Sequence, residues 1–143
     1  MPEGVEVYRW TEQGYRPLVF SDGWMVALLN WEPIMDLEKA TEIERHKETD
    51  EVFILLKGHA ALYVTTAEGM RVVEMQPGLI YNVRKNTWHN LLASHDVALL
   101  IVENRDTHLR DTETRNLSPS EMDTLKKNLA SHIFGISPQR AKE

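Results

Sequence analysis

Short apolar segments separated by turn residues recur through the first hundred residues, and they limit the chain to a few folds. The segments are residues 5–10, 18–20, 24–31, 52–56, 60–64, 70–75, 79–83 and 97–103. Each is short for a helix, and between most of them lie Gly, Pro, Asn, Asp or Ser, which favour turns. This spacing predicts strands. We therefore expect an all-β protein folded as a closed sandwich or barrel.

One helix is expected near the C-terminus, over residues 118–135. Ser118 and Glu121 have the spacing of a capping box, and Pro119 falls at the first helical position. Apolar residues then repeat at three- and four-residue steps, and Gly135 would end the helix. We expect the helix to pack across the outside of the barrel.

Chain length sets the domain organisation. The 143 residues suffice for one domain with one core. The parts expected within the single domain 1–143 are N-terminal strands over 1–43, the barrel core over 44–103, a polar connector over 104–117, the helix over 118–135 and a tail over 136–143.

Composition excludes several classes of function. The formal net charge is −6, from 16 Lys and Arg against 22 Asp and Glu, which argues against a nucleic-acid or anionic-membrane partner. Because there is no cysteine, any metal would be held by nitrogen and oxygen ligands. The first residues lack the pattern of a signal peptide, and no apolar run is long enough to cross a bilayer. A cytoplasmic protein is therefore expected.

Ionisable side chains gather in two separate stretches. If the first stretch is extended, Glu44, His46 and Glu48 share one face. Glu51 then begins a strand whose inward positions are apolar, so its carboxylate would lie at the mouth of the barrel and needs a partner. In the second stretch, His89 follows a turn and would also point inward. Together these groups would surround one divalent metal ion.

The two stretches resemble the motifs of the cupin superfamily, commonly written G-x5-H-x-H-x3,4-E-x6-G and G-x5-P-x-G-x2-H-x3-N. His46, Glu51 and Gly58 have the spacing of the second histidine, the glutamate and the last glycine of the first motif. Gly78 and His89 have the spacing of the first glycine and the histidine of the second. Several spacings agree at once. The resemblance implies a cupin jelly-roll β-barrel with an internal ligand pocket, and it favours a homodimer.

The chain departs from both motifs. Glu44 stands where the first metal-binding histidine belongs, and Arg84, Asn86 and Ala93 replace the proline, the inner glycine and the asparagine of the second motif. The metal ligands that the resemblance then implies are Glu44, His46, Glu51 and His89. This set suits Fe(II), Mn(II), Zn(II) or Ni(II), and nothing in the sequence chooses among these ions.

A second resemblance offers another ligand set. The chain resembles ectoine synthase, a cupin that also lacks the histidine pair of the first motif. That family binds its metal through glutamate, tyrosine and histidine. Glu51, Tyr81 and His89 stand at the matching positions, and residues 77–81 resemble that family's proline-glycine-x-x-tyrosine segment. Tyr81 is therefore a candidate ligand or proton-moving residue.

Each candidate also has a plainer interpretation. Glu51 would instead satisfy backbone donors at a turn, although its spacings to His46 and Gly58 favour the ligand interpretation, and His46 would be an exposed strand residue if the register slipped by one. Glu44 and Glu48 would be solvated charges, and Tyr81 would be a core tyrosine. No metal role is expected for the four remaining histidines, His59, His95, His108 and His132.

The expected function is that of a metal-dependent enzyme acting on a small hydroxy acid, keto acid or sugar. The metal would polarise a carbonyl or stabilise an enediolate, while Glu48, Glu44 or Tyr81 moves a proton. Isomerase or lyase chemistry would follow, or dioxygenase chemistry with Fe(II). The alternative is a non-catalytic cupin that senses or carries a small molecule, and a metal-free structural barrel is a third interpretation.

Overall fold

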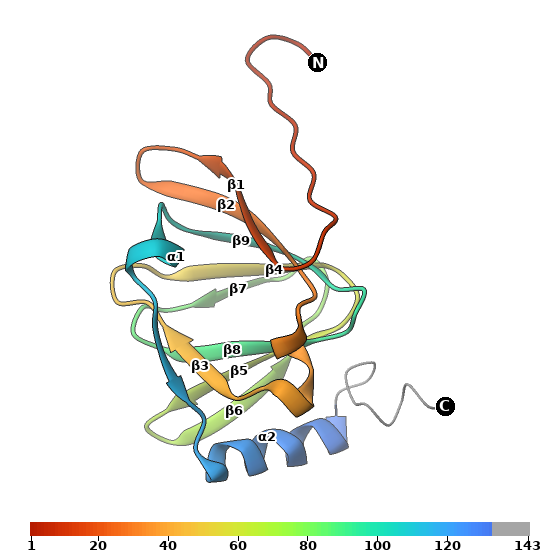
Figure 1. Ribbon diagram of the computed structural model, residues 1–143, viewed down its shortest axis with the longest axis vertical. Helices are drawn as coiled ribbons and strands as arrows, with labels where there is room; N and C mark the ends of the chain where they lie inside the picture. The colour runs from red at the N-terminus through yellow and green to blue at the C-terminus, as the bar shows by residue number, and fades with distance from the viewer. Residues whose placement is uncertain (133–143) are drawn as a thin grey trace.

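The computed structural model describes residues 1–132, which form two five-stranded sheets with antiparallel pairing throughout (Figure 1). The first sheet has the order β1 (Tyr15–Phe20), β2 (Trp24–Asn30), β9 (Ala98–Asn104), β4 (Glu51–Lys57) and β7 (Ile80–Val83). The second has the order β10 (Glu113–Asn116), β3 (Glu42–Arg45), β8 (Trp88–Ala93), β5 (Ala60–Thr66) and β6 (Gly69–Glu74). The expected all-β class is confirmed.

Four short or terminal helices complete the described chain. They are the 3-10 turns η1 (Pro33–Met35) and η2 (Leu37–Lys39), and the α-helices α1 (Thr107–Arg110) and α2 (Pro119–His132). None of the helices in this part of the chain is long and apolar enough to cross a membrane.

The main core lies between the sheets and follows the period-two pattern of the sequence. On β4, Phe53 and Leu55 are buried, and on β9 Leu99 and Ile101 are buried beside them. Leu91 of β8 contributes from the second sheet. Because alternate residues of a strand point to opposite faces, the intervening positions of β4 and β9 are more exposed.

A second core lies between α2 and the outer face of the second sheet. On β5, Ala60 and Leu62 belong to the main core, whereas Ala61 and Tyr63 belong to this outer core with Leu125 of α2. The strand is therefore apolar on both faces. The expected position of the helix across the outside of the barrel is confirmed.

The start of α2 is the capping box that the sequence predicts. The Ser118 hydroxyl accepts a hydrogen bond from the Glu121 N–H at 3.1 Å, and the Glu121 carboxylate accepts one from the Ser118 N–H at 2.9 Å. Arg115 makes a bidentate ion pair with the same carboxylate. The predicted end at Gly135 and the tail over 136–143 lie outside the described residues.

Two sequence predictions differ from the structure. Residues 5–10 do not form a strand: they pair with no strand of the first sheet, which ends at β1, and Val7 is 69% exposed. The predicted connector over 104–117 contains α1 and β10, and β10 pairs with β3 although its sequence is polar. This second difference matters because the connector contributes to the site.

Candidate metal centre

Three strands bring the four ligand candidates of the sequence together at one end of the space between the sheets. Glu44 on β3 lies opposite His89 on β8, and His46 follows directly after β3. Glu51 is the first residue of β4 and pairs with Val83 of β7. One potential ligand atom from each of the four candidates lies within 4.8 Å of every other.

The two histidines are oriented by hydrogen bonds to backbone carbonyls. Nδ1 of His46 donates to the Asp111 oxygen and Nδ1 of His89 donates to the Thr87 oxygen, both at 2.8 Å. A carbonyl only accepts, so Nδ1 carries the proton in both rings. Nε2 of each ring then lies 2.9 Å from the same atom, Oε1 of Glu51. In the neutral form, each Nε2 offers a lone pair to this shared position.

The donor set fits a divalent transition metal. Ligands bound at roughly 2.0–2.2 Å from an ion lie at most about 4.4 Å apart. The 4.8 Å spread of the cluster is close to this limit, so small shifts would bring all four atoms into contact with one ion. Two imidazoles and two carboxylates suit iron, manganese, zinc or nickel.

Hydrogen bonds and charges within the cluster shift the pKa values of its members. Burial acts to raise the pKa of Glu51, but hydrogen bonds with His46 and His89 outweigh it and lower the pKa to about 2. Burial likewise opposes protonation of His46, yet the hydrogen bond with Glu51 raises its pKa to about 9. The pKa of His89 is raised in the same way. Burial and the Glu51 charge raise the pKa of Glu44.

These shifts predict how the stability of the metal-free protein depends on pH. A raised histidine pKa stabilises the fold fully below the ordinary value of 6.5, and this stabilisation is lost as the pH rises through about 9. We expect the free energy of unfolding in EDTA to fall by roughly 1–3 kcal/mol between pH 6.5 and 9. Urea unfolding across this range measures it. Glu51→Gln should weaken the dependence, whereas a wild-type stability that rises with pH would contradict the assignment.

Glu103 is a site residue that the sequence analysis missed. It continues the inward face of β9 after Leu99 and Ile101 and is 5% exposed. Its Oε1 accepts a hydrogen bond from the Tyr15 hydroxyl at 2.8 Å. Its Oε2 is buried without a hydrogen-bond partner, 3.9 Å from Nε2 of His46. Burial and then the Glu51 charge raise the pKa of Glu103 to about 8.

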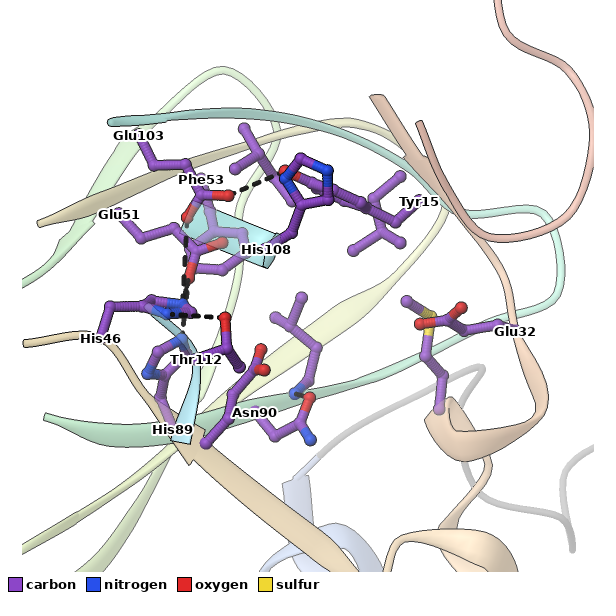
Figure 2. Close-up of a pocket in the computed structure, with 15 residues that line it drawn as sticks. Tyr15, Glu32, His46, Glu51, Phe53, His89, Asn90, Glu103, His108 and Thr112 are labelled. Atoms are coloured by element: carbon purple, nitrogen blue, oxygen red, sulfur yellow. Dashed lines mark hydrogen bonds and ion pairs between the residues drawn. The ribbon is translucent and has the colours of Figure 1, made fainter. Parts of the chain in front are cut away.

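The cluster opens into a cavity of about 250 Å³ between the sheets (Figure 2). Its wall consists of Tyr15, Leu29, Glu32, Met35, Glu44, His46, Glu51, Phe53, His89, Asn90, Leu91, Ile101, Glu103, His108 and Thr112. The segment that the sequence predicted as a connector, 104–117, supplies His108. The centroid of its ring lies 5.6 Å from the centroid of the Tyr15 ring. His108 therefore faces the pocket, although it is not one of the four clustered candidates.

The structure does not bring Glu48 into the pocket. The extended segment ends near His46, because the Asp111 carboxylate accepts hydrogen bonds from the N–H groups of Lys47 and Glu48 and holds a turn there. The exposed Glu48 side chain lies 3.4 Å from Arg110. The expected proton-moving role of Glu48 thus has no support from its position.

Tyr81 is also outside the cavity wall. It pairs with Phe53 across β7 and β4 and packs against the main core, as its plainer interpretation predicts. Its hydroxyl accepts a hydrogen bond from the Gln76 N–H at 2.9 Å. The ligand set suggested by ectoine synthase is therefore not assembled, and the position of Tyr81 does not favour a role as ligand or acid.

The motif substitution at Asn86 has a structural explanation. Asn86 has a φ of 68°, in the left-handed region. The inner glycine of the second motif adopts this region without steric cost, and asparagine tolerates it. Its N–H donates to the His46 oxygen at 2.7 Å, which ties the second motif to the first. Asparagine thus preserves the turn that precedes His89.

Solved structures with a similar fold share little sequence with this chain. A cupin-2 domain protein from Shewanella frigidimarina is 21% identical, with a TM-score of 0.52 over 67% of this chain and 85% of that one. KdgF from Halomonas is 13% identical, with a TM-score of 0.52 over 71% and 92%. A Streptomyces Pac13 variant with uridine is 12% identical, with a TM-score of 0.55 over 80% and 89%.

Comparison of the sequence with protein families and curated proteins finds no relative. No protein-family model matches it, and no curated protein does. Identities of this size establish a common fold alone. The two sheets, the motif spacings and these structures agree, and the chain has the cupin fold.

Proposed function

We propose that this protein is a metal-dependent cupin enzyme that acts on a small, oxygen-rich molecule by lyase or isomerase chemistry. The observation that carries the proposal is the convergence of His46, Glu51 and His89 at the end of a cavity, next to a buried carboxyl oxygen of Glu103 that has no hydrogen-bond partner. With Glu44 they would hold a divalent ion, which supplies Lewis-acid polarisation of a bound oxygen.

Glu103 takes the proton-moving role in this proposal. Tyr15 fixes one carboxyl oxygen, and the other is free to meet a ligand. In the metal-free protein, burial raises the pKa of this carboxyl group toward the neutral range, where a group can give or accept a proton in acid–base catalysis. Pac13, which has a similar fold, is described as a nucleoside dehydratase. Dehydration is lyase chemistry, so this supports the proposal by analogy.

The test is elemental analysis of protein purified without a metal-affinity tag. We expect about one equivalent of iron, manganese, zinc or nickel, and at least roughly tenfold less in His89→Ala and Glu51→Gln. His59→Ala removes an exposed histidine outside the cluster and should keep the metal. Wild-type protein that stays metal-free after reconstitution would overturn the proposal and favour a binding or structural barrel. The homodimer implied by the resemblance stays a prediction, which light scattering would test.

A further inference from the structure

The cavity wall has an unusual charge composition. Four carboxylate side chains line it, those of Glu32, Glu44, Glu51 and Glu103. Among the residues that the structure describes, no Lys or Arg lines it. A smaller adjoining cavity shares Glu32 and Glu44 with it, adds Glu42, and has no lysine or arginine in its described wall either.

The positive charge of the cluster does not offset all four carboxylates. Two protonated imidazoles or one divalent ion bring the same charge of +2, and Glu44 and Glu51 balance it in either state. Glu32 and Glu103 then remain as surplus acceptors. Even if both were protonated, the cluster and the four carboxylates together would carry no net positive charge; His108, the third histidine of the wall, stands outside this sum.

The surplus groups lie where a ligand would meet them. Oε2 of Glu103 is buried without a hydrogen-bond partner and lies beside the histidine cluster. Glu32 lies between β2 and η1, away from the histidines, as Figure 2 shows. Neither Glu32 nor Glu44 makes a side-chain hydrogen bond or ion pair with another described residue. A ligand in the cavity would therefore meet carboxylate oxygens of Glu32, Glu44 and Glu103 to which no described residue donates a hydrogen bond.

From this arrangement we propose that the ligand is a hydroxyl- or amine-bearing molecule of about monosaccharide size that carries no carboxylate or phosphate. The inference rests on the proposed function and narrows its substrate class. A hydroxyl suits Glu103 in both protonation states, because it can donate to a carboxylate or accept from a carboxylic acid. An anionic group would lie beside the surplus carboxylates of Glu32 and Glu103 in a site partly shielded from water, where like charges repel strongly. The cavity of about 250 Å³ is below the roughly 300–1,000 Å³ of sites for drug-sized ligands.

Calorimetric titration of the metal-loaded protein tests this proposal. Ribose, glucose and galactose are each compared with the matching sugar acid and sugar phosphate, and glucosamine and galactosamine supply the amines. We expect at least one neutral sugar or amino sugar to bind roughly tenfold or more tightly than its anionic counterparts. Equal or tighter binding of the anions would overturn the proposal, and so would binding by no member of the series.

Charge reversal at Glu32 provides the matched variant. Glu32→Lys should reduce the preference for the uncharged compound by roughly tenfold, because it replaces a surplus negative charge with a positive one. Glu38→Lys makes the same change on the exposed side of η2 and should leave the preference unaltered. An unchanged preference in Glu32→Lys would overturn the assignment. Metal content is measured in every sample, so anion binding with the metal retained contradicts this inference alone, whereas a metal-free wild type contradicts the proposed function.

Discussion

Glu103→Gln is expected to lower kcat by roughly 10²–10⁴-fold while leaving the metal content and the fold unchanged. The amide matches the carboxyl group in size and can still accept the Tyr15 hydrogen bond, but it cannot exchange a proton at the position of Oε2. The measurement is turnover of compounds found by screening sugars, hydroxy acids and keto acids, with elemental analysis and circular dichroism of the same samples.

Tyr15→Phe is the companion variant because it removes only the group that positions Glu103. We expect a smaller loss of about tenfold and a shifted acid limb in the pH profile of kcat/KM. If Glu103→Gln retained full turnover, the proton-moving role would belong elsewhere. If the wild type bound ligand but turned over none of the compounds, the protein would be the non-catalytic cupin of the alternative interpretation.

Gly58→Ala is expected to lower the free energy of unfolding by about 3 kcal/mol, a large share of the stability of a small domain. Gly58 has a φ of +78°, which costs any residue with a Cβ roughly 1–2 kcal/mol. An added Cβ would also lie 2.9 Å from Cα of Val97 and 2.8 Å from the Asp96 carboxylate. The backbone contact cannot be relieved by a side-chain rotation, so the strands must shift. Equilibrium unfolding in urea measures the loss.

Gly78→Ala separates the cost of the positive φ from the cost of the close contact. Gly78 has a similar φ of +82°, but nothing lies within 4 Å of an added Cβ. Its replacement should therefore cost only the conformational part, about 1 kcal/mol. Equal losses at the two glycines would show that the close approach at Gly58 does not contribute to stability.

Period-two alternation accounts for most of what the sequence predicted correctly. It placed Glu51 on the inward face with Phe53 and Leu55, and the structure buries all three. The same signal was present on β9, where Glu103 follows Leu99 and Ile101 at alternate positions. A glutamate at the end of an apolar, alternating strand is therefore a sign of a buried carboxyl group. It was missed because Glu103 belongs to neither motif.

The alternation failed where a distant segment ended a strand. In the sequence, Glu48 continues the alternate spacing of Glu44 and His46. In the structure, hydrogen bonds to the carboxylate of Asp111 turn the chain at Lys47. Only the folded structure brings Asp111 there, through the pairing of β10 with β3. For Tyr81 the sequence left a pocket role and a core position open, and the structure packs it against the main core, outside the cavity wall.

The sequence by itself determined the strand-rich class, the start of the terminal helix and the two motif segments, because turn residues, capping and side-chain alternation act between near neighbours. The tertiary structure decided which polar groups share the cavity. Tyr15, Glu32 and Glu103 come from three segments outside the two motifs, and His108 comes from a polar connector. Their meeting depends on strand order and register across the two sheets. No local pattern encodes those long-range pairings, so the acidic character of the pocket became visible only in the fold.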